Sequence, residues 1–434
     1  MSPDPTASYA VGTFCVDATP PIGSPVAYAP ARSITDPLSA RGIVILGADA
    51  PIVLCVLDWL GLGRSARDTW RAALAEAAAT TIDRVAVQTV HQHDAPRWDR
   101  DAEELLGAHG LGGQWFDTDF ATTVVQRCAE AVRAAVDEAQ PCTHVGFATA
   151  RVDRIASNRR VLGPDGRVLH QRMSSCTDPE AVAAPEGEID PELTMISLWH
   201  DDRPIAVLTS YACHPQSHYG QGDVTAEWVG IARQQREDEL GIPHIHLTGA
   251  AGDVAAGKYN DGTPPRRAEL AGRLADAMTR AWHGTTRDPL TEVGWRSVPT
   301  TLPLARWLDR DVLRENLVNP DAHRTARIRA ATKLCLLASS DPQAHTAPVD
   351  ITALGLNAVR LLLLPGEPFV AYQLHARASR TEPVMVAGYG DYSFGYIGTR
   401  IAYQQGGYET TEPASNVSPE VEDVLIAAID RALR

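Results

Sequence analysis

Two hydrophobic periods alternate along the chain, and each predicts a different kind of element. Residues 42–46 and 52–58 are apolar runs of strand length separated by Gly47-Ala-Asp-Ala50, which predicts a β-hairpin. A second hairpin is predicted at residues 192–199 and 205–211. Further strands are predicted at residues 84–90, 145–152, 244–248 and within the apolar run 353–364. Apolar residues at helical spacing predict helices over residues 65–80, 119–139, 224–240, 265–282, 309–317, 322–337 and 420–433.

The order of these elements indicates the fold class. Strands and helices are mixed without strict βαβ alternation, and no internal repeat, low-complexity tract or evident linker divides the chain. We therefore expect a single α/β (α+β) domain over residues 1–434, with mixed β-sheets flanked by helices.

Composition and charge exclude several classes of partner. The chain has 434 residues, 44% of them hydrophobic, and a formal net charge of −15, which argues against nucleic acid and against anionic membranes. No apolar stretch is long enough for a membrane span, and Met1-Ser-Pro-Asp-Pro-Thr6 lacks the pattern of a secretory signal. The seven cysteines have no regular spacing and include no C-x-x-C pair. These features predict a cytoplasmic protein with reduced thiols, and they leave open a cationic or neutral small substrate.

The segment Arg84-Val-Ala-Val-Gln-Thr-Val-His-Gln-His-Asp-Ala-Pro96 holds the most informative polar residues. It begins as a buried strand and ends at His91, His93 and Asp94. Side chains two positions apart in a strand share a face, so His91 and His93 can point into one cavity. Metal binding is one interpretation, and two histidines hydrogen-bonded within the fold is the other.

Two further apolar strands end in polar groups. His214 follows the run 205–211, and Glu367 follows the run 353–364. Two neutral imidazoles and one carboxylate are typical of a catalytic zinc site with a coordination position left open for water. The same ligands also suit other divalent ions. The alternatives are that His214 caps a loop and that Glu367 is a helix N-cap.

A series of short motifs runs along nearly the whole chain. They are Gly12-Thr-Phe-Cys-Val-Asp17, Asp36-Pro-Leu-Ser-Ala-Arg41, Leu57-Asp58, Val90-His-Gln-His-Asp-Ala-Pro96, Ser157-Asn-Arg159, Ala212-Cys-His214, Gly249-Ala-Ala-Gly-Asp-Val254, Leu364-Pro-Gly-Glu-Pro368 and Tyr392-Ser-Phe-Gly-Tyr396, continuing to Tyr403 and Tyr408. In sequence and in order, these motifs resemble those of the neutral/alkaline non-lysosomal ceramidase family. The last two matches are the most specific. The resemblance implies the family's N-terminal catalytic domain, without its C-terminal β-sandwich.

The resemblance also implies roles for individual residues. It implies that Zn²⁺ is bound by His91, His214, Glu367 and Tyr396. It implies that three further residues line the reacting centre: His93, Arg159 and Tyr408. These side chains can donate hydrogen bonds to the oxyanion that forms when a carbonyl is attacked.

The chain departs from the family pattern at two positions. Ala255 stands where the family has a serine that is important to activity, so no serine-dependent step can occur there. Asp94 replaces another serine, beside the histidines. Its carboxylate is expected to act as general base, to orient His93 or to anchor a substrate amine, and capping the end of the strand is the alternative.

These features predict a zinc-dependent amidohydrolase that cleaves a C–N amide bond of a soluble small molecule with metal-activated water. Secondary metabolism is the expected context. We also weigh acyl transfer or amide formation on the same metal site, hydrolysis of an ester or lactone, and a non-catalytic binding protein with the ceramidase fold. Neither stable membrane association nor nucleic-acid binding is expected. The oligomeric state, the acyl group and the amine are not predicted.

Overall fold

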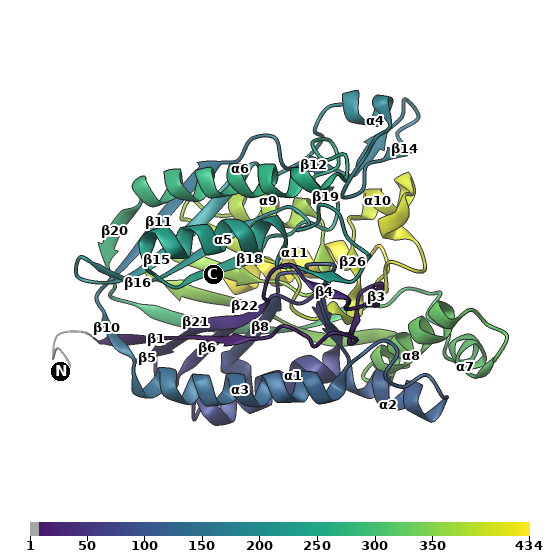
Figure 1. Cartoon of the computed structure of the whole chain (residues 1–434), viewed down its shortest axis with the longest axis horizontal. Coiled ribbons are helices and arrows are strands. Elements are labelled where there is room, and N and C mark those ends of the chain that lie inside the picture. Colours follow the sequence, from purple (N-terminus) through teal and green to yellow (C-terminus); the bar gives the residue numbers. More distant parts are fainter. Residues whose placement is uncertain (1–7) are drawn as a thin grey trace.

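Three β-sheets at the centre of the molecule are covered by helices on two sides (Figure 1). The computed structural model describes residues 8–434. The first seven residues, which include the segment without a secretory signal pattern, lie outside the described residues. The mixed α/β fold class predicted from the sequence is confirmed.

The first sheet contains the predicted strand that leads to His91. Its strand order is β10-β1-β5-β6-β8, formed by β10 (Gln140–Cys142), β1 (Tyr9–Asp17), β5 (Ser39–Leu46), β6 (Ile52–Leu57) and β8 (Val85–Thr89). The predicted hairpin is β5 and β6, which pair antiparallel with Ile45 opposite Ile52, whereas β6 and β8 are parallel. Helices α1 (Arg64–Ala77) and α3 (Thr118–Asp137) cover one face of this sheet.

The second sheet supplies the strand that precedes His214. Its order is β18-β16-β15-β11-β20, formed by β18 (His244–Thr248), β16 (Arg203–Tyr211), β15 (Glu192–His200), β11 (His144–Arg151) and β20 (Thr286–Pro289). Strands β15 and β16 are the second predicted hairpin, and β16 pairs parallel with β18. Helices α5 (Glu227–Leu240) and α6 (Pro264–His283) pack on this sheet. Helix α5 begins three residues later than predicted, because Val224 belongs to the short strand β17 (Asp223–Val224).

The third sheet precedes Glu367 and was predicted least completely. Its order is β21-β22-β23-β25, formed by β21 (Val293–Pro303), β22 (Thr346–Leu356), β23 (Val359–Leu363) and β25 (Val384–Ala387). The apolar run 353–364 therefore contains the end of one strand, a turn at Asn357 with φ of 53°, and a second strand. Helices α9 (Val370–Ala378) and α11 (Val421–Leu433) pack on this sheet.

The remaining elements are short strands and helices around this framework. They are β2 (Pro25–Val26), β3 (Ala29–Pro30), β4 (Ser33–Ile34), β7 (Gly61–Leu62), β9 (Arg97–Trp98), β12 (Ser157–Asn158), β13 (Arg160–Leu162), β14 (Val168–Gln171), β19 (Val254–Ala255), β24 (Glu367–Pro368), β26 (Tyr396–Ile397), α2 (Arg100–Ala108), α4 (Pro179–Ala183), α7 (Arg310–Val318), α8 (Arg324–Ala338), α10 (Arg400–Gln405) and the single-turn helices η1 (Ile82–Arg84), η2 (Tyr392–Phe394) and η3 (Tyr408–Thr410).

Burial on both faces explains why the central strands are continuous apolar runs. In β6, Val53, Cys55 and Leu57 belong to the core shared with α1 and α3. The alternate residues Ile52, Leu54 and Val56 belong to the core between the sheets. Successive side chains of a strand point to opposite faces, so a strand with two covered faces has few polar positions. Polar side chains are therefore concentrated beyond the strand ends.

The carboxyl ends of six strands, in three parallel pairs, meet at one place in the molecule. Each of the pairs β6–β8, β16–β18 and β23–β25 is parallel. The segments that follow β8, β16 and β23 contain His91, His214 and Glu367, respectively. Ligand sites in α/β proteins form outside the carboxyl ends of strands, so the fold itself places these three residues together.

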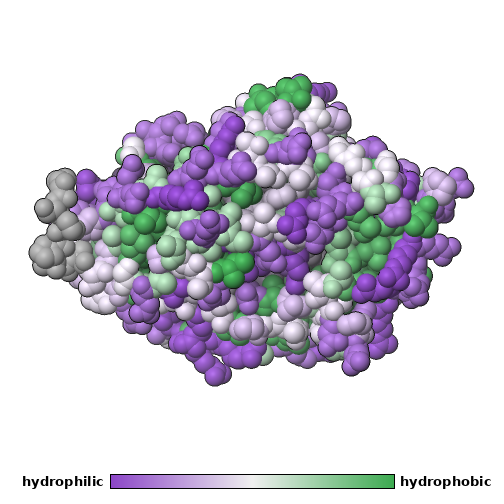
Figure 2. All heavy atoms as spheres, turned by 90° about the horizontal axis from the view of Figure 1, so that it is seen from below, coloured by the Kyte–Doolittle hydropathy of each residue, from purple (hydrophilic) through white to green (hydrophobic). Residues whose placement is uncertain are grey.

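The surface seen from below is predominantly hydrophilic, with apolar residues in separate small patches (Figure 2). Among residues 8–434, no helix combines the length and the apolar character that a membrane span requires.

Candidate metal centre and its surroundings

His91 has an unusual backbone conformation directly after β8. Its φ is 76°, in the left-handed region that residues other than glycine rarely adopt. Its backbone N–H donates to the Trp59 carbonyl at 2.9 Å, and its Nδ1 donates to the Leu60 carbonyl at 2.7 Å. Because Nδ1 carries the proton, Nε2 presents a lone pair to the site. The ring of Tyr389, which also has positive φ, stacks on the His91 ring at 4.4 Å.

His214 is held in the same way from the second sheet. Its backbone N–H donates to the Val254 carbonyl at 3.0 Å, and its Nδ1 lies 2.7 Å from the Ala251 carbonyl. The carbonyl can only accept, so Nδ1 is the donor and Nε2 again has a free lone pair. A backbone carbonyl that fixes the tautomer is the usual partner of a metal-binding histidine.

Glu367 lies in a strand pair and is not a helix N-cap. Strand β24 pairs parallel with β26, which places Glu367 beside Tyr396, and α9 begins only at Val370. Gly366 has φ of 59°, and a Cβ there would lie 2.6 Å from the Gly395 carbonyl oxygen. A Cβ on Gly252 would lie 2.2 Å from the Glu367 carbonyl oxygen. Both glycines are therefore needed for the chains to pack this closely around the carboxylate.

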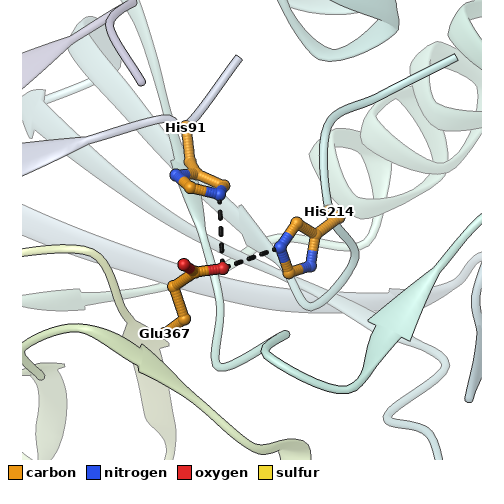
Figure 3. Close-up of side chains that lie close together, drawn as sticks. All are labelled: His91, His214 and Glu367. Atoms are coloured by element: carbon orange, nitrogen blue, oxygen red, sulfur yellow. Dashed lines mark hydrogen bonds and ion pairs between the residues drawn. The ribbon is translucent and has the colours of Figure 1, made fainter. Parts of the chain in front are cut away.

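The three side chains converge on a common point (Figure 3). Glu367 Oε2 lies 3.0 Å from His214 Nε2 and 3.4 Å from His91 Nε2, and all three candidate ligand atoms lie within 4.8 Å of one another. Zn²⁺ binds nitrogen and oxygen at about 2.0–2.2 Å, so tetrahedral ligand atoms are separated by about 3.3–3.6 Å. The observed spacing is close to this separation.

The chemistry of these donors fits a divalent cation. With both Nδ1 atoms protonated, three lone pairs face one another, and this arrangement is repulsive unless a cation lies between them. Burial lowers the pKa of His214, so the imidazole is neutral at pH 7. Burial raises the pKa of Glu367, but the neighbouring His91 and His214 outweigh burial and hold this pKa well below its usual range. Neutral imidazoles and an ionised carboxylate are the forms that bind metal.

His93 lies beside this triad and contacts two tyrosines. Its Nε2 is 3.2 Å from His91 Nε2, and its Nδ1 is 2.7 Å from the hydroxyl of Tyr28. The Tyr219 ring packs edge-on against the His93 ring at 5.1 Å. Burial and the neighbouring histidines hold the pKa of His93 well below its usual value, so its ring is neutral.

Arg159 and two tyrosines form a second wall of the site. Arg159 Nη1 is 3.0 Å from the Tyr396 hydroxyl, and Arg159 Nε is 3.2 Å from Glu409, a buried carboxylate. The Tyr396 ring is stacked at 6.1 Å on the ring of His214, and Tyr408 packs edge-on against Tyr396 at 5.7 Å. Burial lowers the pKa of Arg159, but Tyr396 and Glu409 raise it by more, so the net shift is upward and the guanidinium stays charged.

The carboxylate of Asp94 accepts hydrogen bonds from the backbone of a neighbouring loop. Each of its carboxylate oxygens lies 3.0 Å from the backbone nitrogen of Gly220, and Oδ1 lies 3.4 Å from that of Gly222. These contacts favour the cap interpretation over a general base or an amine anchor. Asp94 thereby holds the loop that contains Tyr219.

Ala255 is buried in β19, where it pairs with Ser157 of β12. The Ser157 hydroxyl donates to the Ala255 carbonyl at 2.9 Å, so the serine is engaged with the backbone.

Sequence reasoning missed four residues of this region: Tyr28, Tyr219, Tyr389 and Glu409. Each is adjacent in space to a predicted site residue but comes from a loop or turn with no recognisable spacing. For Glu409, the only available signal was its place next to Tyr408.

Comparisons of the chain with known proteins identify its fold. No protein-family model matches the chain, and no curated protein matches its sequence. Among solved structures, the neutral ceramidase from Pseudomonas aeruginosa matches with a TM-score of 0.71 and 15% identity, over 98% of this chain and 74% of that one. A ceramidase complexed with C2 matches with a TM-score of 0.70 and 14% identity, over the same shares of 98% and 74%. The chain therefore has the fold of the neutral ceramidases, as its sequence motifs predicted.

Proposed function

We propose that the protein is a zinc-dependent amidohydrolase. The observation that carries this proposal is the convergence of three lone pairs, from His91, His214 and Glu367, beside a wall of hydrogen-bond donors. A carboxylate and two imidazoles leave room for further ligands, and Tyr396 is the residue proposed to supply one of them. The structural likeness to ceramidases, which are amidases, supports an amide as the bond cleaved.

The residues around the triad have distinct proposed roles. When bound, zinc would polarise the amide carbonyl and lower the pKa of water to about 7. Arg159 and Tyr408 donate hydrogen bonds to the oxygen that becomes negative during attack. His93 moves the proton: when its Nδ1 donates to Tyr28, its Nε2 has the free lone pair that accepts a proton from water. The same Nε2–H then returns the proton to the leaving amine.

Water is the proposed nucleophile because the chain offers no serine at the position of Ala255. The side chain there is a buried methyl group, and the nearby Ser157 hydroxyl is bonded to the backbone. An attack by water releases a free carboxylic acid and an amine, which distinguishes hydrolysis from acyl transfer.

Product analysis on a panel of soluble amides tests the proposal. Wild type is expected to release acid and amine in equal amounts, and His214→Ala is expected to lose both the metal and the activity. His283→Ala is the matched control, because His283 is exposed on α6. Full activity of a metal-free His214→Ala protein would refute the proposal. Acyl products formed only in the presence of an added amine would replace hydrolysis with acyl transfer.

A further inference from the structure

The side chain of Arg97 points away from the hydrophobic core because of its position in a short strand. It lies in β9, which pairs parallel with β7 so that Arg97 is opposite Gly61. The next residue, Trp98, is buried, and its Nε1 donates to Thr118 at 3.1 Å. Because neighbouring strand residues point to opposite faces, Arg97 points away from the core that contains Trp98.

The surroundings of Arg97 are those of the candidate site. A Cβ on Gly61 would lie 2.6 Å from the ring of Tyr392, and this ring is 5.6 Å from that of His91. One guanidinium nitrogen of Arg97 donates to the Ala27 carbonyl. Ala27 precedes Tyr28, which is hydrogen-bonded to His93. The backbone of Arg97 therefore lies beside Gly61, which packs on Tyr392, and its guanidinium reaches the segment that contains Tyr28.

Trp115 fixes the plane of the guanidinium. The Arg97 Cζ lies 3.7 Å from the centre of the Trp115 ring, which is a stacking distance. Stacking holds one face of the guanidinium while its edge nitrogens remain available for a planar, bidentate partner. Only one of these nitrogens is hydrogen-bonded to the protein within residues 8–434.

Arg97 differs from the other arginines near the site because it lacks a carboxylate partner. Arg159 is paired with Glu409 at 3.2 Å, and Arg233 with Asp58 at 2.6 Å. In the part of the chain that the structure describes, no carboxylate forms an ion pair with Arg97. Burial lowers the pKa of Arg97 to about 10, partly opposed by Tyr392 and Tyr28, so the group remains charged at pH 7.

A second cation lies on the same side of the site. Arg329 is exposed on α8, and its charge acts on both Arg97 and Tyr408. The chain as a whole has a net charge of −15, so two guanidinium groups that form no ion pair within residues 8–434 are a local exception. A positive site in an acidic protein attracts an anionic group of a ligand.

We propose that Arg97 binds a carboxylate on the substrate, which makes the substrate class an anionic amide such as an N-acyl amino acid. This inference rests on the proposed function, since it names the substrate class of the same site. The stacked guanidinium holds the carboxylate while the amide carbonyl reaches the triad. Neutral amides of the same size lack this anchor and are poorer substrates.

Pairs of substrates with and without a carboxylate measure the contribution of Arg97 to kcat/KM. The probes are N-acetyl-, N-hexanoyl- and N-decanoylglycine and the corresponding N-acylglycinamides, which differ only in the charge. Wild type is expected to have a higher kcat/KM on the glycine member of a pair. In Arg97→Gln, the ratio of the two kcat/KM values falls about tenfold to a hundredfold, as expected for losing a hydrogen bond to a charged group. The control Arg100→Gln, at an exposed position paired with Asp101, keeps the wild-type ratio.

Calorimetric binding of the same acylglycines separates this inference from the proposed function. Binding that persists in His214→Ala and is lost in Arg97→Gln places the carboxylate on Arg97, even if no amide is hydrolysed. If this binding pattern is seen and no amide is hydrolysed, the anion site at Arg97 is supported and the hydrolase proposal is wrong. Binding lost in His214→Ala and kept in Arg97→Gln would place the carboxylate at the metal and overturn the inference. Absence of acylglycine binding to wild type, or an unchanged ratio in Arg97→Gln, would also overturn it.

Discussion

The metal triad (His91, His214 and Glu367) and the tyrosine rim (Tyr28, Tyr219 and Tyr408) are built in different ways. Each triad residue follows a buried strand, and both histidine rings are hydrogen-bonded to backbone carbonyls. The rim residues lie on a short hairpin, a loop and a single helical turn, and Tyr28 and Tyr408 are 53% and 39% exposed. The comparison indicates that the sheets fix the candidate metal ligands, whereas the side chains that surround them are supplied by loops and turns that can vary.

Glu367→Ala is expected to have the largest effect. Removing the only carboxylate of the triad leaves two neutral imidazoles, so bound zinc is lost and amide hydrolysis falls to background. Activity and metal content of the purified variant are the measurements. Glu315→Ala, at an exposed position on α7, is the control and is expected to keep both. A Glu367→Ala protein that still hydrolyses amides would show that the triad is not the reacting centre.

Tyr408→Phe is expected to lower kcat by about a hundredfold, as found when one donor to a developing oxyanion is removed. The bound zinc should remain, because Tyr408 is outside the triad, and its exposure predicts little loss of stability. Steady-state kinetics and elemental analysis check both points. Loss of the metal in this variant would show that Tyr408 contributes to metal binding, so that the rim and the triad could not be treated as separate.

Tyr28→Phe removes only the hydroxyl that contacts His93 Nδ1 at 2.7 Å. We expect about a tenfold fall in kcat, the lower end of the effect of removing an outer partner of a site histidine. The KM for an uncharged amide should change little, because the phenyl ring remains. A rise in KM with kcat unaltered would instead mean that Tyr28 binds the substrate and does not orient His93.

The smallest predicted effect concerns the framework beneath the triad. His246 in β18 is buried, and burial lowers its pKa from 6.5 to about 3. Below pH 6.5 the unfolded chain therefore binds a proton that the folded chain does not, so stability falls as the pH decreases from 6.5 towards 3. At pH 5.5 this amounts to about 1.4 kcal/mol.

Thermal unfolding between pH 7.5 and 5.5 measures this loss. His246→Gln should show a smaller fall over the same range, with the triad still able to bind zinc. An equal pH dependence in the variant and in wild type would show that His246 does not contribute.

The sequence predicted those parts of the fold that depend on local pattern. The β5–β6 hairpin and most helices follow from apolar spacing, and His91, His214 and Glu367 stand out because each interrupts an apolar run at its end. Strand β21 was not predicted, because its residues are mostly half-exposed and show little alternation of apolar and polar positions.

The residues around the triad depend on contacts between distant segments. Glu409 was not predicted because its partner Arg159 lies far away in the sequence, and the same holds for Tyr28 and His93. For Asp94, the sequence left a role at the reacting centre and a cap at the end of the strand as alternatives. The backbone N–H of Gly220, in a loop that no local pattern connects with Asp94, donates to its carboxylate and favours the cap.

The central claim is that the three converging lone pairs bind one metal ion, and elemental analysis tests it most directly. Wild type should contain about one zinc per chain, removable by a chelator and restored by added zinc. The variants His91→Ala and Glu367→Ala should contain none, while His283→Ala matches wild type. A wild-type protein that neither contains nor takes up a divalent metal would contradict the account, and the fold would then serve a binding protein.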